Sequence, residues 1–223
     1  MIRIYYHVYV IDGVEAIINE QLELIKKWID RPYLLTIGIS VAEEDKSADS
    51  IIRLIQDYNM NTDVIVGDIK AGDNEFVTLN LIQRDKQSFD DSDYILYLHT
   101  KGASRQNDPD YSLIKQWRNR MQVINIQYIN NVFDVLDSGI FNTYGYSLET
   151  VNDPSNIMYS GNFWWMLGSY AKTIDITDVD ITNRSSAELH YIQRGDNWKP
   201  YSVVKRGDNW NPYLDFLKKE KII

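Results

Sequence analysis

The chain has 223 residues, of which 44% are hydrophobic and 25% charged, and its formal net charge is −9. This composition is typical of a globular protein and excludes a disordered or collagen-like chain. The acidic balance also argues against nucleic acid as a partner, because neutralising phosphates requires a surplus of Lys and Arg.

Two further absences narrow the class of protein. The sequence contains no cysteine, so we expect neither a disulfide framework nor a thiolate nucleophile. No apolar stretch approaches the roughly 20 residues that a membrane-spanning helix needs, so we expect no membrane span. These features suit a cytoplasmic protein, in the host cytoplasm if the chain is viral, as its Asn- and Ile-rich composition hints.

The first half of the chain alternates between strand-like and helix-like patterns. Residues 2–11 predict a buried strand that ends at a turn, and the apolar residues from Val14 to Ile29 recur at helical spacing. Further strands are expected at 34–41, 63–68 and 94–98, and further helices around 51–58, capped by Ser47 or Asp49, and 76–82, capped by Asp73. The alternation predicts an α/β fold with a mainly parallel sheet flanked by helices.

The second half of the chain is less regular. Apolar spacing from Ile114 predicts one long helix that runs to about Gly139, and an aromatic run at 163–165 follows. Residues 194–201 recur in similar form as 206–213, which predicts two similar loops. We expect a single domain, with residues 1–105 as the nucleotide-binding half and 106–223 as the acceptor-side half.

Ligands of open α/β sheets bind beyond the carboxyl ends of the strands. The polar residues expected there are Asp12, Glu43, Glu44, Asp68, Lys70 and the segment His99-Thr100-Lys101-Gly102. The acidic motif Asp91-Ser92-Asp93 precedes its strand. It therefore lies at the amino edge of the sheet, opposite to the edge at which ligands bind. The similar motif Asp178-Val179-Asp180 would be a ligand pair only if it folded back near the fourth strand.

The segment His99–Gly102 combines groups that suit a diphosphate. Lys101 can neutralise phosphate charge, Thr100 and nearby amides can donate hydrogen bonds, and Gly102 lets the backbone approach a ligand closely. His99 can bind a metal ion or a phosphate. The alternative is a hydrogen-bonded strand-end histidine followed by a surface lysine.

Four motifs, in this order and spacing, resemble a family of glycosyltransferase-like proteins of bacteria and large DNA viruses. They are the segment Tyr94–Gly102, Trp117-Arg118-x-x-Met121, Tyr159–Trp165 and Arg184-x-x-Ala187-Glu188, together with Glu75 and Thr78-Leu79. The resemblance covers roughly residues 72–190 and implies the GT-A fold, a nucleotide-binding sheet joined to an acceptor-binding part.

The resemblance implies transfer of a sugar from a nucleoside-diphosphate sugar to a hydroxyl of a carbohydrate or glycoprotein acceptor, with Mn or Mg assisting. His99-Thr100-Lys101 occupies the place of the family's metal-binding Asp-x-Asp, so Lys101 would take over part of the role of the ion. His99 and His190 are the candidate metal ligands. His190 followed by Lys199-Pro200-Tyr201 also loosely resembles a C-terminal element of retaining enzymes.

The candidate site residues fall into three further predicted roles, and His99 has one of them besides that of metal ligand. The catalytic residues would be Glu188, as general base, with His99 and Lys101. The donor-binding residues would be Asp12, Asp68, Thr100, Gly102, Arg118, Ser160, Gly161 and Asn162. The acceptor-binding residues would be Trp164 and Trp198.

Several alternatives stay open. Trp117 would be a core residue. Trp164 or Trp165 would face the sugar or fill the core, and only one of them can point to each face of the sheet. Arg118 would reach a phosphate or pair with an acid, and Glu188 would act as base or bridge to Arg184. At the level of the whole protein, the rivals are a noncatalytic carbohydrate-binding module and a nucleotide-sugar binder without turnover.

Overall fold

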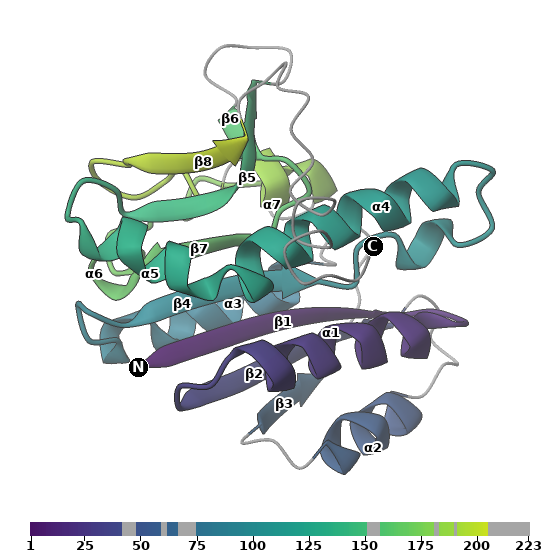
Figure 1. The fold of residues 1–223 in the computed structure, drawn as a ribbon. Helices are drawn as coiled ribbons and strands as arrows, with labels where there is room; N and C mark the ends of the chain where they lie inside the picture. The colour runs from purple at the N-terminus through teal and green to yellow at the C-terminus, as the bar shows by residue number, and fades with distance from the viewer. Residues whose placement is uncertain are drawn as a thin grey trace.

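The chain folds around one eight-stranded mixed sheet with helices on both faces, as a computed structural model shows (Figure 1). The structure describes residues 1–41, 48–58, 62–66, 75–150, 157–180, 183–189 and 191–204. This confirms the predicted α/β class. Within the described residues, no helix is long and apolar enough to cross a membrane.

The amino-terminal half supplies four parallel strands in the order β3-β2-β1-β4. These strands are β1 (Ile2–Val10), β2 (Tyr33–Val41), β3 (Thr62–Val66) and β4 (Tyr94–His99). The connecting helices are α1 (Val14–Trp28), α2 (Asp49–Asp57) and α3 (Phe76–Asp85). All seven elements were predicted from the sequence, with boundaries that differ by a few residues at most.

The strand order reverses between β1 and β4. The chain moves outward from β1 to β2 and β3, and then crosses back to pair β4 with the other side of β1. As a result, buried residues of α1 and α2 pack in one core cluster and those of α3 in the other. In open α/β sheets such a reversal leaves a crevice at the carboxyl ends of the two central strands.

The helix caps differ from the prediction. The residue before α2 is Ala48, which makes no side-chain capping bond, and Asp49 is the first helical residue. There its carboxylate still interacts favourably with the amino-terminal end of the helix dipole. Ser47 and Asp73 lie outside the described residues.

The predicted long helix is interrupted. Its first part is α4 (Tyr111–Gln122), followed by a π-helical segment, η3 (Val123–Gln127), and then by α5 (Ile129–Asp137). Tyr128, between η3 and α5, leaves the helical region with φ −94° and ψ 33°. The apolar spacing on which the prediction depended continues across this break, because α4, η3 and α5 all pack against the same core cluster.

The rest of the chain completes the sheet. The added strands are β5 (Thr143–Thr150), β6 (Ile157–Tyr159), β7 (Trp164–Leu167) and β8 (Pro200–Val204), with short helices α6 (Gly168–Ala171) and α7 (Arg184–Leu189). Strand β7 pairs antiparallel with both β4 and β5, and β8 pairs parallel with β5. The sheet is therefore continuous from the first half of the chain into the second.

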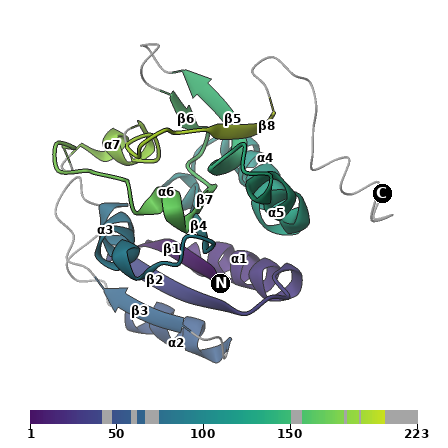
Figure 2. The ribbon, with the colours of Figure 1, turned by 90° about the vertical axis from the view of Figure 1, so that its left-hand side faces the viewer.

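The two faces of the sheet carry separate helical layers (Figure 2). Helices α1, α4 and α5 cover one face, and α3, α6 and α7 cover the other. Trp165 packs in the first layer and Trp164 in the second, and both are fully buried. The prediction that these neighbours face opposite sides is confirmed.

Candidate functional site

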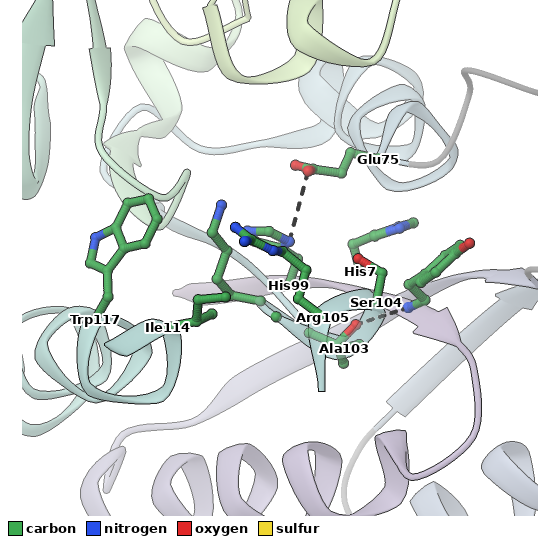
Figure 3. Close-up of a pocket in the computed structure, with 12 residues that line it drawn as sticks. His7, Glu75, His99, Ala103, Ser104, Arg105, Ile114 and Trp117 are labelled. Atoms are coloured by element: carbon green, nitrogen blue, oxygen red, sulfur yellow. Dashed lines mark hydrogen bonds and ion pairs between the residues drawn. The ribbon is translucent and has the colours of Figure 1, made fainter. Parts of the chain in front are cut away.

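A cavity of about 100 Å³ lies at the carboxyl ends of β1 and β4, where the strand order reverses (Figure 3). Its lining comes from β1, the segment after β4, the start of α3 and one side of α4: His7, Tyr9, Glu75, residues 99–105, Ile114 and Trp117. The prediction that the segment His99–Gly102 lies at this edge of the sheet is confirmed. The cavity is smaller than the roughly 300 Å³ of small ligand pockets.

The turn after β4 is fixed to β1 by Thr100. Its amide donates to the carbonyl of His7 at 3.0 Å, and its Oγ1 accepts a hydrogen bond from the amide of Tyr9 at 3.0 Å. Gly102 follows with φ +85°, and a Cβ there would lie 2.7 Å from Cγ2 of Ile114. Glycine therefore allows both the backbone conformation and the close approach of α4.

His99 connects the two motifs that the sequence singled out. Its Nε2 lies 3.0 Å from the carbonyl oxygen of Gly161. Because a carbonyl oxygen can only accept, Nε2 carries the hydrogen. The opposite nitrogen, Nδ1, lies 3.8 Å from Oε1 of Glu75 (Figure 3).

Glu75 is a buried carboxylate in the cavity wall to which the sequence assigned no role. It is 4% exposed, and its Oε2 accepts hydrogen bonds from the hydroxyl of Tyr97 at 2.9 Å and from Nδ2 of Asn162 at 2.6 Å. Burial and the neighbouring Glu75 raise the pKa of Tyr97 well above its ordinary value, so Tyr97 remains a donor. The only signal for Glu75 in the sequence was its place in the segment that resembles the family.

The segment Ser160–Asn162 lies against His99, and the side chain of Asn162 bonds within the protein. Both polar atoms of the Asn162 amide are hydrogen-bonded, because Nδ2 donates to Glu75 and Oδ1 accepts from Nε1 of Trp164 at 2.8 Å. Ser160 is buried, and its amide donates to the carbonyl of Ser147. Gly161 has φ +83°, and a Cβ there would lie 2.2 Å from Sδ of Met121. Of the residues that line the cavity, this segment contacts His99 and Glu75, and it is not itself part of the lining.

Lys101 brings a positive charge to the cavity. Its Nζ lies 3.4 Å from Oε1 of Glu188 and 4.7 Å from the ring centroid of Trp117. Glu188, on α7, is 27% exposed, so its carboxylate is accessible to solvent. The predicted alternative for Glu188 is a salt bridge to Arg184, whose side chain lies outside the described part of the structure.

Arg118 pairs with an acid, which is one of its two predicted alternatives. Its side chain is 1% exposed and lies 3.3 Å from Oε1 of Glu20. Its Nη1 donates to the carbonyl of Lys101 at 2.9 Å. Arg118 therefore supports the turn after β4. Its guanidinium is too deeply buried to contact a ligand.

The two predicted acceptor-binding tryptophans require correction. Trp164 has no exposed surface and stacks between Tyr97 and Tyr191, with centroid distances of 4.9 and 5.8 Å, so it fills the core. Trp198 donates through Nε1 to Oγ1 of Thr143, at the beginning of β5. Thr143 is in register, through β7, with the beginning of β4, so Trp198 lies at the edge of the sheet opposite to the cavity.

The remaining candidates lie apart from the cavity or outside the described residues. Asp12 is exposed in the turn after β1, where its carbonyl accepts from Nε2 of Gln106 at 2.9 Å. Asp68 and His190 lie outside the described residues, as does the second copy of the 194–201 motif. For these residues the predicted roles stay predictions.

The acidic motif Asp91-Ser92-Asp93, which precedes β4, forms ion pairs within the protein. Asp93 is fully buried and accepts hydrogen bonds from the N-terminal ammonium and from Nε of Arg3, each at 2.8 Å. This pairing lies at the amino end of β4, as the sequence indicated. In the second acidic motif, Asp178 forms an ion pair with Arg194 at 2.9 Å.

The described residues around the cavity do not by themselves fit a divalent ion. Across the described part of the chain, no group of three His, Asp or Glu side chains is placed to hold a metal. In the cavity, His99 Nε2 and Glu75 Oε2 are already hydrogen-bonded, whereas a divalent ion takes four or more ligands.

Comparison with known proteins gives distant structural likenesses only. No protein-family model and no curated protein matches the sequence. Among solved structures, the chain is similar to the mannosyltransferase PcManGT from Pyrobaculum calidifontis, solved in complex with GDP-Man and Mn²⁺. The match has 12% identity and a TM-score of 0.37, and it covers 92% of this chain but 58% of that one. A likeness at this level carries no statement about activity.

Proposed function

We propose that the chain binds a nucleoside-diphosphate sugar at the carboxyl ends of β1 and β4 and transfers the sugar to an acceptor hydroxyl. One observation carries the proposal: the cavity lies at the reversal of strand order, and the Lys101 ammonium lies in its wall. This is where open α/β sheets bind phosphorylated ligands. The motif resemblance, in which the same segment takes part, supports the same function.

The cavity suits the diphosphate better than the whole donor. At about 100 Å³ it has less volume than a drug-sized ligand needs. The diphosphate would lie at Lys101 and the amides of the turn, and the rest of the donor would extend beyond the described wall. Asp12 and Asp68, at neighbouring strand ends, are the proposed contacts there, with His190 and a Mn or Mg ion as further proposals.

The chemistry divides between Lys101 and Glu188. The acceptor oxygen attacks the anomeric carbon of the sugar, and the bond from that carbon to the phosphate oxygen breaks. Lys101 stabilises the negative charge that develops on the leaving diphosphate, and Glu188 accepts the proton of the acceptor hydroxyl. Because Lys101 and Glu188 pair at 3.4 Å, a bound diphosphate competes with Glu188 for the ammonium and frees the carboxylate to act as base.

A ligand screen tests the proposal. Thermal unfolding is measured with nucleoside diphosphates and nucleotide sugars, each with and without Mn²⁺, because a ligand that binds only the folded state raises Tm. We expect a positive shift with at least one nucleotide sugar. Absence of a shift with all of them would overturn the proposed function.

Two variants then separate binding from turnover. Lys101→Ala should weaken binding about tenfold or more, whereas Glu188→Gln should keep binding and lose transfer. The control is Lys172→Ala, because Lys172 also forms an ion pair, with Asp91 at 2.8 Å, but at the opposite edge of the sheet. Equal loss of binding and transfer in Glu188→Gln would assign Glu188 a structural role. Binding without transfer in the unmodified protein would make it a nucleotide-sugar binder.

A further inference from the structure

Trp117 is a large aromatic side chain that borders the cavity. The sequence predicted a core residue, and one part of the indole does pack against the core cluster of α1 and α4. The side chain is only partly buried, however, and it belongs to the lining of the cavity (Figure 3). Trp164 and Trp198 were predicted to contact a sugar. Trp164 is buried, and Trp198 lies at the opposite edge of the sheet.

Three elements bring polar and apolar groups together at this indole. Lys101, in the turn after β4, places its ammonium 4.7 Å from the ring centroid and also 3.4 Å from Glu188 on α7. Gly161 is also close to the indole, because a Cβ there would lie 3.3 Å from Cε2 of Trp117. A side chain at position 161 would therefore press against the indole.

The spacing of these groups matches one part of a nucleotide sugar. In such a donor the sugar ring is bonded directly to the terminal phosphate, so a phosphate site and a sugar site must be neighbours. Lys101 supplies the charge for the phosphate, and Trp117 supplies a flat apolar surface for the C–H groups of the ring. An ammonium that bonds the phosphate also leaves the indole face, which frees that face for the ring.

Resting on the proposed function, we infer that Trp117 binds the sugar ring of the donor by stacking while Lys101 binds the attached phosphate. The sugar-stacking role thus belongs to Trp117 on α4 and not to Trp164 or Trp198. Trp117 accordingly contributes to the affinity for the sugar part of the donor and little to the affinity for the nucleoside diphosphate.

The test compares each nucleotide with its sugar conjugate. Isothermal titration calorimetry gives Kd for UDP, UDP-glucose, GDP and GDP-mannose, and the ratio of the two Kd values within a pair isolates the contribution of the sugar. In Trp117→Leu we expect this sugar contribution to fall about 3- to 10-fold, as expected for loss of an aromatic contact. Kd for the nucleoside diphosphate alone should change less than about threefold, since only the cation–π contact of Lys101 is lost.

Two further variants serve as controls. Trp117→Phe keeps an aromatic face and should retain most of the sugar contribution, which also covers the case in which the leucine variant does not fold. Trp28→Leu removes a tryptophan that likewise has a lysine over its ring, Lys27 at 5.2 Å, but at the end of α1 away from the cavity. We expect it to leave every Kd unchanged.

The outcomes distinguish the inference from the proposed function. If Trp117→Leu weakens nucleotide and nucleotide sugar by the same factor, or weakens neither, the inference is wrong and the proposed function stands. If the unmodified protein binds none of the nucleoside diphosphates and nucleotide sugars of the ligand screen, these four included, the proposed function is wrong and the inference is overturned with it.

Discussion

At the scale of single residues, Glu75 connects the parts of the candidate site. Its carboxylate is the shared acceptor for Tyr97 on β4 and for Asn162 before β7, and it faces the ring of His99. Three segments that are distant in the sequence therefore depend on one side chain. The sequence could not show this role, because an acidic residue before a helix is equally typical of a solvated helix end.

We expect Glu75→Ala to lower the free energy of unfolding by about 2 kcal/mol or more. The substitution leaves two buried donors without an acceptor, and each such donor costs about 1–3 kcal/mol. Glu75→Gln keeps one acceptor oxygen and should cost less than half as much. Urea denaturation measures both variants.

The control for this prediction is another carboxylate that accepts from a tyrosine. Asp85 accepts from the hydroxyl of Tyr5 at 2.9 Å, but it is 22% exposed, so water can replace it in Asp85→Ala. This control should lose less than about 1 kcal/mol. An equal loss in Glu75→Ala and Asp85→Ala would contradict the role given to Glu75.

At the scale of elements, the approach of α3 to β2 decides where Glu75 lies. A Cβ on Gly38 of β2 would lie 2.1 Å from Oγ1 and 3.0 Å from Cα of Thr78 on α3. Thr78 also bonds Nδ1 of His7 at 3.0 Å, so helix and sheet are joined by a polar contact in the core. Glycine at position 38 is therefore required for α3, and for the carboxylate just before it, to reach the cavity.

We expect Gly38→Ala to destabilise the protein by about 1–3 kcal/mol, as overpacking of a close contact does. In the double variant with Thr78→Ala, the closest clash is gone, although Cα of residue 78 remains near. The loss in the double variant should be smaller than the sum of the two single losses, since the residues are in contact. Additive losses in urea denaturation would show that Gly38 and Thr78 do not meet as described.

A second contact between elements lies at the amino ends of β1 and β4, where the N-terminal ammonium and Arg3 donate hydrogen bonds to Asp93. Burial alone would raise the pKa of Asp93, but hydrogen bonds from the N-terminal ammonium, from Arg3 and from the amide of Asp90 outweigh it and lower the pKa below its ordinary value. The stabilisation is therefore complete above about pH 4, the ordinary pKa of Asp, and is lost as pH falls through the lower folded-state value.

Unfolding free energies measured from pH 2 to pH 7 test this contact. Asp93→Asn should lose about 1–3 kcal/mol at pH 7 and show a weaker fall of stability below pH 4 than the unmodified protein. Asp91→Asn is the matched control, because Asp91 is 78% exposed and should add little. A pH profile that is the same for Asp93→Asn and the unmodified protein would be the contrary result.

The elements also show what local sequence could predict. The seven elements of the parallel half follow from apolar spacing, because β1, β2 and β4 are buried on both faces and the helices on one. The break between α4 and α5 was missed, since η3 keeps the same side buried and so leaves the apolar pattern intact. The position of β7 between β4 and β5 depends on pairings between distant segments, for which the sequence carries no local signal.

At the scale of the whole molecule, the position of the candidate site could be predicted better than its contacts. The rule that ligands bind at carboxyl ends of strands placed His99–Gly102 correctly, because strand direction follows from the βα alternation. Which tryptophan faces the cavity depends on register and helix placement: Trp117, expected in the core, lines the cavity, and Trp164, expected to face an acceptor, is fully buried.

The continuity of the sheet predicts how the whole molecule unfolds. Strand β7 pairs with β4 of the first half and β5 of the second, and both core clusters contain residues from both halves of the chain. Neither half can lose its structure without exposing the core of the other. We therefore expect one cooperative transition, the behaviour of a single domain.

Two probes with different locations test this expectation. Trp28 is the tryptophan of the first half, and the other five lie beyond residue 105, so fluorescence of a Trp28→Phe variant reports the second half alone. Far-UV circular dichroism reports helices of both halves. The two urea transitions should have the same midpoint and slope, because the seam between β4 and β7 leaves no boundary at which one half could unfold first. A fluorescence midpoint that differs from the circular dichroism midpoint would divide the chain into separate folding units near residue 105.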